Sequence, residues 1–262
     1  MHSFQLTRGA RPLLVSMPHV GLALPPGLVE QLTPEARLLP DTDWHLDRLY
    51  QFAGDLGVSV IIPRFSRYVI DLNRPADDTP LYPGAEGTGL IPLQTFSGQP
   101  LYLPGCVPDD SSQRLRDYWQ PYHTAVREEL ARLAALAGTA VLFEAHSICS
   151  TVPRLFDGRL PDLNLGTASG QSCAPELRDR ASAALREQGD YSVVVDGRFK
   201  GGYLTREYGR PDQGIHALQL ELSQATYMQE ESPFTYLPEL AAGVQPVLRH
   251  LLETILAWVE QG

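Results

Sequence analysis

Apolar residues along the chain fall into short runs and helical stripes that alternate from one end to the other. Four consecutive apolar residues at 140–143, within the stretch 139–147, predict a short and fully buried strand. Further strands are predicted at residues 13–17, 58–62, 67–72, 163–165, 191–195 and 215–222. Helical spacing predicts helices over residues 42–56, 111–137, 174–188 and 237–259. Strands that alternate with helices are typical of an α/β fold with a mixed or mostly parallel sheet.

Two segments depart from this alternation. The long stripe at 111–137 contains Pro121, which predicts a kink or a break between two helices. Residues 73–108 are dense in proline and glycine and lack a periodic pattern, so they predict a long loop of the kind that often serves as a lid or binding loop. No internal repeat divides the chain, and we expect residues 1–262 to form a single domain.

Polar side chains occupy the ends of the predicted strands and the start of one helix. Ligands in open α/β sheets bind beyond the carboxyl ends of the strands, so these side chains are expected to share one site. They are imidazoles and carboxylates, at positions His19, Asp43, His45, Glu144, His146 and Glu221.

These residue types are those of a catalytic zinc site, in which protein ligands leave one position to water. His19 and His146 are the first two candidate ligands, since both directly follow predicted strands. Asp43 is the third candidate and His45 is its rival. The alternatives are a hydrogen-bonded core histidine for His146, a helix cap for Asp43 and a solvated helix face for His45.

Glu221 lies between two leucines of a predicted buried strand. A buried carboxylate is costly unless it is paired or catalytic. Glu221 is therefore a candidate general base for a zinc-bound water, and an ion pair with a buried arginine is the alternative. Glu144 shares this ambiguity, and we favour a structural role for it, such as a hydrogen-bond partner of a ligand histidine.

Arginines flank the same segments. Arg67 precedes a predicted strand, Arg74 follows it within Asn-Arg-Pro, and Arg206 lies in the glycine-containing segment 201–210. An arginine can hold a carboxylate through two parallel hydrogen bonds, or stabilise an oxyanion. A solvated side chain is the alternative for any single arginine, but the position of Arg74 favours a function.

Composition narrows the class of partner. The net charge of −10 and the absence of a Lys/Arg-rich cluster argue against nucleic acid, but not against a small anion. No apolar run approaches the ~18 residues of a membrane span, and the first residues do not resemble a signal peptide. Three cysteines without metal-ligand spacing favour a reduced, cytoplasmic protein.

Together the motifs resemble the N-formylglutamate amidohydrolase (N-formylglutamate deformylase) family. The resemblance rests on five stretches in order along the chain: residues 16–21, 41–44, 67–75, 144–147 and 201–223. That family is similar in fold to the zinc carboxypeptidases and to aspartoacylase. The resemblance therefore implies a three-layer α/β fold, with a mixed, mostly parallel central sheet flanked by helices. It also implies one hydrolytic zinc ion, or another divalent metal in its place.

The resemblance also implies roles for single residues. Asn73 and Arg74 would bind a substrate carboxylate, Arg67 would polarise the scissile carbonyl, and Glu221 would act as general base and acid. Zinc carboxypeptidases place a glutamate three residues after the first histidine, whereas this chain has Leu22 there. The second ligand must come from elsewhere, and Asp43 is the choice.

The expected reaction is zinc-dependent hydrolysis of N-formyl-L-glutamate to L-glutamate and formate, a step of histidine degradation. The substrate is a small dicarboxylate, so a second cation is needed, either Arg206 or Lys200, with Tyr203 as a further substrate-binding candidate. The alternatives are another N-acyl-amino-acid hydrolase, a small carboxypeptidase, or a silent binding protein for acidic metabolites. Glu221 argues against a silent binding protein, since such a protein needs no water-activating carboxylate.

Overall fold

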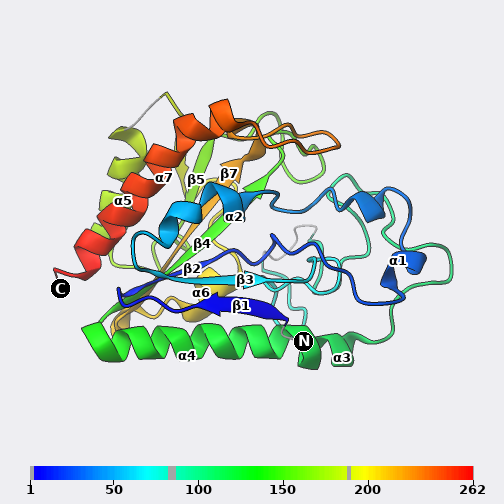
Figure 1. The fold of residues 1–262 in the computed structure, drawn as a ribbon, viewed down its shortest axis with the longest axis horizontal. Helices are drawn as coiled ribbons and strands as arrows, with labels where there is room; N and C mark the ends of the chain where they lie inside the picture. The colour runs from blue at the N-terminus through cyan, green and yellow to red at the C-terminus, as the bar shows by residue number, and fades with distance from the viewer. Residues whose placement is uncertain (1–2, 82–86, 188–189, 262) are drawn as a thin grey trace.

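A seven-stranded mixed sheet forms the centre of the computed structural model, which describes residues 3–81, 87–187 and 190–261 (Figure 1). The strand order is β1-β3-β2-β4-β7-β5-β6. Strands β2, β3, β4 and β7 run parallel, and β1 and β5 join them antiparallel. The strands are β1 (Phe4–Thr7), β2 (Leu13–Ser16), β3 (Ser59–Pro63), β4 (Ala140–Ile148), β5 (Leu163–Gly166), β6 (Val193–Val195) and β7 (Ile215–Ser223). The predicted mixed, mostly parallel sheet is confirmed.

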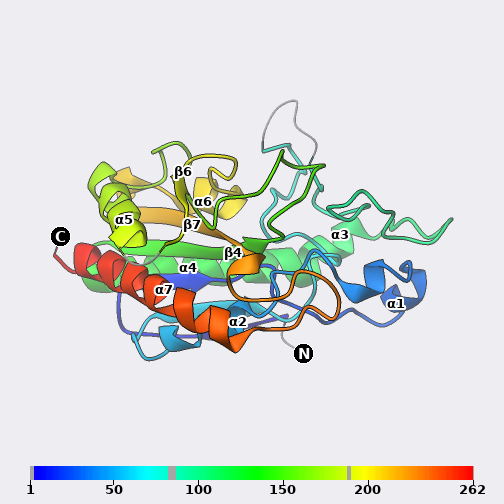
Figure 2. The same cartoon turned by 90° about the horizontal axis from the view of Figure 1, so that it is seen from above.

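Helices cover both faces of this sheet, which gives three layers (Figures 1 and 2). One face is covered by α4 (Gln120–Ala137), and the other by α5 (Pro175–Glu187) and α7 (Pro238–Val259). Among the described residues, no helix is long and apolar enough to cross a membrane. The shorter helices are α1 (Leu28–Gln31), α2 (Leu46–Leu49), α3 (Ser111–Arg114) and α6 (Tyr203–Tyr208), with single turns at Ala36–Leu38, Gln51–Ala53, Pro211–Gln213 and Gln224–Thr226.

The two-residue period of strand β4 separates two hydrophobic cores. Val141 and Phe143 pack into the core beneath α5 and α7, whereas Ala140 and Leu142 pack into the core beneath α4. Successive side chains of a strand point to opposite faces, so all of β4 is buried although only alternate residues face each helix layer. This explains the continuous apolar run at 140–143.

Two predicted elements differ from the structure. In place of the predicted helix 42–56, the structure has the shorter α2 and a turn at Gln51–Ala53. His45 has a left-handed backbone with φ of 62°, so α2 begins only after it. The prediction of a strand at residues 67–72 is wrong, since this segment forms turns and irregular backbone. Its apolar residues are buried, but Tyr68 and Val69 pack against a small core that includes Leu101 and Tyr102 instead of joining the sheet.

Other boundaries agree more closely with the sequence. The helix predicted at 111–137 consists of α3, a π-helical segment at Leu115–Trp119 and α4, so the predicted irregularity lies just before Pro121. Pro121 occupies the first turn of α4, where a missing N–H is tolerated. Residue 188 of the predicted helix 174–188 and residues 82–86 of the predicted loop 73–108 lie outside the described residues.

Candidate active site

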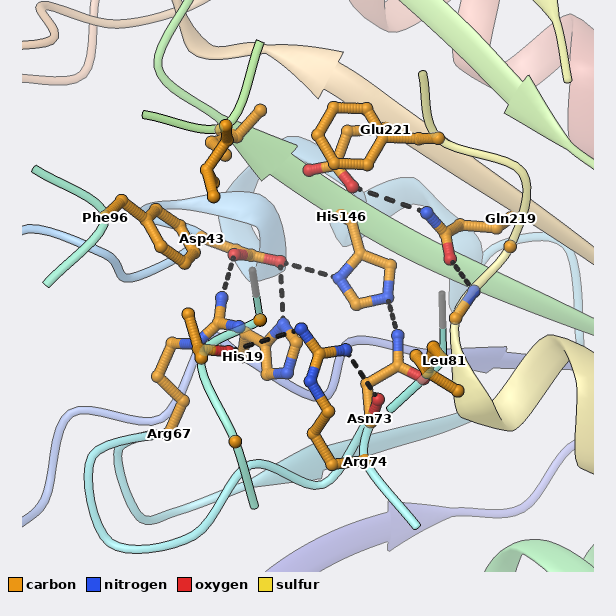
Figure 3. Close-up of a pocket in the computed structure, with 18 of the residues that line it drawn as sticks. His19, Asp43, Arg67, Asn73, Arg74, Leu81, Phe96, His146, Gln219 and Glu221 are labelled. Carbon is orange, nitrogen blue, oxygen red and sulfur yellow. Dashed lines mark hydrogen bonds and ion pairs between the residues drawn. The ribbon is translucent and has the colours of Figure 1, made fainter. Parts of the chain in front are cut away.

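A cavity of about 310 Å³ opens beside the carboxyl ends of β2, β4 and β7 (Figure 3). Seven residues singled out from the sequence line it: His19, Asp43, Arg67, Asn73, Arg74, His146 and Glu221. They come from five segments that are distant in sequence. The structure therefore brings together the strand-end groups that the sequence analysis expected to share one site.

Strand β4 places His146 in the cavity by its alternation. The strand continues to Ile148 instead of ending at Phe143, so Glu144 and His146 lie within it, on the same face as Leu142. In the neighbouring strand β7, Glu221 pairs in register with His146. An imidazole and a carboxylate are therefore held side by side by backbone hydrogen bonds.

Asp43 lies on an irregular segment that is fixed at three backbone positions. Its own N–H donates to the carbonyl of His19 over 3.1 Å. The carbonyl of Thr42 accepts from Gln224 Nε2 at 3.0 Å, and that of Trp44 accepts from the Tyr227 hydroxyl at 2.8 Å. The segment that carries Asp43 is thus fastened to the segment following β2 and to the end of β7.

His19, Asp43 and His146 form a buried group that could hold a metal ion. Their candidate ligand atoms all lie within 4.8 Å of one another. Asp43 Oδ2 is 3.0 Å from His146 Nδ1 and 3.7 Å from His19 Nδ1. Burial opposes ionisation of Asp43, but the hydrogen bond from His146 and the neighbouring imidazole of His19 lower its pKa, so the carboxylate is ionised as a metal ligand must be. The donor set, two imidazoles and one carboxylate, fits a divalent metal such as zinc.

His45, the rival of Asp43, lies apart from this group. Its Nε2 is 2.7 Å from the carbonyl oxygen of Phe234, and its ring contacts Trp44 and Tyr236. Asp43 also does not cap α2, because the residue at the cap position is His45 and no side chain caps that helix. The geometry favours Asp43 over His45 as the third candidate ligand.

Asp71 links one candidate ligand to a neighbouring arginine. Its Oδ1 accepts from His19 Nε2 at 2.7 Å, and its Oδ2 accepts from Arg67 Nη2 at 2.7 Å. Burial would raise the pKa of Asp71, but His19 and Arg67 hold it well below its usual range. A proton kept on Nε2 leaves the Nδ1 lone pair of His19 directed toward Asp43, and such hydrogen bonds orient metal-binding histidines.

Asn73 joins His146 to α6. Its Nδ2 lies 3.1 Å from His146 Nε2, and its Oδ1 accepts from the backbone N–H of Leu204 at 2.9 Å. A Cβ atom on Gly202 would lie 2.2 Å from Asn73 Nδ2, so only glycine permits this close approach. Glu144 also faces His146, at 3.7 Å from Nε2, and accepts from Thr205 Oγ1 at 2.8 Å.

Glu221 is buried at the wall of the cavity and is contacted by Gln219. Gln219 Nε2 donates to Glu221 Oε2 at 3.3 Å, and Gln219 Oε1 accepts from the N–H of Gly202 at 2.7 Å. Burial raises the pKa of Glu221 above its ordinary value, against the opposing charge of His146. Gln219 was not among the residues predicted from the sequence, although its position two residues before Glu221 places it on the same face of β7.

Arg67 is buried against both aspartates of the site. Besides Asp71, its Nη1 lies 3.8 Å from Asp43 Oδ1, and its guanidinium lies 4.8 Å from the ring centre of Phe96. Arg74 lines another part of the cavity, where Nη2 donates to Thr88 Oγ1 at 3.2 Å. Two cationic groups therefore reach the cavity from the segment after β3.

The remaining predicted substrate contacts do not lie at the cavity wall. Within residues 3–81, 87–187 and 190–261, Lys200, Tyr203 and Arg206 are not among the lining side chains, whereas Arg198 is. Tyr203 packs near His123 on the α4 side, and Arg206 Nε donates to the carbonyl of Gly201. Arg198 follows strand β6, which runs parallel to β5 and therefore opposite to β7, so the strand-end rule that selected His19 does not apply to it.

Comparison with known proteins decides the family. A family model described as N-formylglutamate amidohydrolase matches residues 11–228. The chain belongs to this family. Two curated relatives are both named N-formylglutamate deformylase. The one from Pseudomonas aeruginosa is 54% identical over 253 residues, covering 96% of this chain and 95% of the relative. The one from Pseudomonas putida is 53% identical over 253 residues, covering 96% and 94%.

Solved structures agree with this assignment. The crystal structure of N-formylglutamate amidohydrolase from Ralstonia eutropha JMP134 has a TM-score of 0.85 at 28% identity, and the match covers 100% of this chain and 98% of the other. A gene product of Agrobacterium tumefaciens, at 17% identity and a TM-score of 0.74, shares the fold over 99% and 97% of the two chains. The predicted family and the predicted class, a hydrolase of amide bonds, are confirmed.

Proposed function

We propose that this amidohydrolase cleaves N-formyl-L-glutamate into L-glutamate and formate in the cytoplasm, with one zinc ion as its cofactor. The names of the two Pseudomonas relatives support the substrate. One observation carries the mechanism: the buried group of His19, Asp43 and His146 shares a cavity with Glu221. A metal-binding group beside a buried carboxylate is the arrangement that water activation requires.

His19, Asp43 and His146 would hold the ion. Zinc, when bound, supplies a Lewis acid and lowers the pKa of a bound water toward about 7. The protein prepares these ligands through their outer contacts, since Asp71 orients His19 and Asn73 contacts His146.

Glu221 is the proposed general base and acid. It takes one proton from the attacking water, whose oxygen bonds to the formyl carbon, and returns a proton to the nitrogen as the C–N bond breaks. Its raised pKa suits this double role, because a catalytic group works best when its pKa lies near the working pH. Gln219 would fix the carboxylate through its contact with Oε2.

The arginines of the cavity match the charges of the substrate. Arg67 is proposed to stabilise the oxyanion that forms on the formyl oxygen. Asn73 and Arg74 are proposed to bind one substrate carboxylate. Arg198 is a better candidate for the second carboxylate than Lys200 or Arg206, since it lines the cavity and they do not.

The test is formate release from N-formyl-L-glutamate, N-formyl-L-aspartate and N-formyl-L-glutamine by zinc-loaded protein. We expect kcat/KM to be highest for N-formyl-L-glutamate. In Arg198→Ala, the ratio of kcat/KM for N-formyl-L-glutamate to that for N-formyl-L-glutamine should fall by about 10- to 100-fold, as expected for loss of a hydrogen bond to a charged group. In Lys200→Ala this ratio should be unchanged. The substrate assignment fails if the zinc-loaded wild type releases no formate from N-formyl-L-glutamate.

A further inference from the structure

A second cavity of about 160 Å³ adjoins the candidate active site. The two cavities share three lining residues, Phe96, Ser147 and Ile148. Beyond them the second cavity is bounded by residues such as Val152 and Pro153, which do not line the first. A mainly apolar space therefore lies next to the reacting groups, with only a few side chains in between.

Phe96 is the aromatic one of these three shared residues. Its ring lies 4.8 Å from the guanidinium carbon of Arg67, and Figure 3 shows it beside Arg67 and Asp43. It also packs against the hydrophobic cluster that contains Ile148 and Val152. The ring therefore contacts Arg67, and Phe96 also borders the second cavity.

The backbone around Phe96 is held in place. The N–H of Phe96 donates to Asp41 Oδ2 at 2.9 Å. A tight turn is closed by the N–H of Gly98, which donates to the carbonyl of Thr95 at 2.9 Å, and Arg154 Nη1 donates to that same carbonyl at 3.1 Å. With its backbone fixed on both sides of the turn, Phe96 can act as a steric limit.

We propose that Phe96 restricts the acyl group of the substrate to formyl, and that the second cavity accepts the carbon chain of a larger acyl group once this ring is removed. The inference rests on the proposed function, in which Arg67 contacts the oxygen of the scissile carbonyl. The group attached to that carbonyl carbon then lies against the Phe96 ring. A formyl group carries only hydrogen there, whereas an acetyl group carries a methyl. In an apolar pocket, one carbon commonly changes kcat/KM by about 10- to 200-fold.

The test compares N-formyl-, N-acetyl- and N-butyryl-L-glutamate, with release of glutamate as the common readout. In Phe96→Ala, kcat/KM for the butyryl compound relative to the formyl compound should rise by at least about tenfold. Phe199→Ala is the matched control, because Phe199 lines the first cavity only, and it should leave the ratio unchanged. Phe96→Leu retains apolar cover over Arg67 and carries the test if the alanine variant does not fold.

A second substitution separates entry into the cavity from general loosening. Val152→Phe would fill the second cavity, so in the Phe96→Ala background it should cancel the gain toward the butyryl compound. A gain that survives this filling would contradict the proposal, as would an unchanged ratio in a folded Phe96 variant. Wild-type protein that fails to hydrolyse N-formyl-L-glutamate would instead overturn the proposed function on which the inference rests.

Discussion

The two halves of the candidate site are positioned by different kinds of structure. His146 and Glu221 lie on β4 and β7, whose register is fixed by a continuous backbone ladder over nine residue pairs. Asp43 and Asp71 lie on segments without regular structure, and their places depend on a few isolated hydrogen bonds, including those from their own N–H groups to the carbonyls of His19 and Leu90. The strand half, with His146 and Glu221, should therefore keep its geometry when a neighbouring side chain is removed. The loop half, with Asp43 and Asp71, should not.

The contacts that hold the loop half come from distant parts of the chain. The carbonyl of Leu72 accepts from His123 Nε2 at 2.9 Å, and that of Arg74 accepts from Trp119 Nε1 at 2.9 Å. Asp71 additionally accepts from the N–H of Asn73 at 2.8 Å. His123 in α4 and Trp119 just before it therefore hold the loop that carries Arg74. The position of this loop depends on contacts with residues distant in sequence.

The largest effect is expected for the histidine of the strand half. His146→Ala removes one of three candidate ligands, so bound zinc and formate release should both fall to background while the sheet remains folded. Metal analysis and a formate assay measure the two, and circular dichroism checks the fold. Retention of metal and turnover would remove His146 from the metal site.

The next largest effect is expected for Glu221→Gln. The amide keeps the size of the side chain but cannot take a proton, so kcat should fall by about 10²- to 10⁴-fold with zinc content unchanged. Glu144→Gln is the matched control, since Glu144 lies on the same face of β4 as His146 and accepts a hydrogen bond from Thr205. At saturating zinc, this substitution should reduce kcat far less than Glu221→Gln. Near-normal turnover of Glu221→Gln would return that residue to a structural role.

In the loop half, Asp71→Asn tests whether a residue outside the ligand group controls it. An amide cannot accept from both His19 and Arg67 as the carboxylate does, so zinc affinity or activity should fall by about 10- to 100-fold. Competition with a chromogenic chelator measures the affinity. If Asp71→Asn binds zinc with the affinity of the wild type, Asp71 is not required to orient His19.

The smallest effect is expected for Tyr227→Phe, which removes the hydroxyl that contacts Trp44 and Ser147. Buried polar atoms left without this partner should cost about 1–3 kcal/mol of unfolding free energy, measured by urea denaturation, and zinc should bind more weakly. Tyr50→Phe is the control, because within the described part of the chain the Tyr50 hydroxyl is buried without a hydrogen-bond partner. Equal stability of the two variants would contradict the role given to Tyr227.

The same division explains how far the sequence could predict this protein. Strand β4 was predictable because continuous burial leaves a run of apolar residues, and β7 because its apolar residues largely alternate with polar ones. The polar side chains near the ends of these strands were selected by type. The segment 67–72 was misread as a strand, because burial against other loops produces the same apolar pattern as burial in a sheet. The contact between His19 and Asp71 joins residues that are 52 positions apart, so no local pattern reveals it. Gln219 and Arg198 carry no local signature beyond their positions on or after strands.

His19, Asp43 and His146 are proposed to bind one divalent metal ion on which deformylation depends. The most direct measurement is a zinc titration of chelator-treated protein, with formate release from N-formyl-L-glutamate followed at each addition. We expect activity to be absent without metal and to rise in proportion to added zinc until one equivalent is bound per chain. Full activity in metal-free protein, or the same titration curve in His146→Ala, would contradict it.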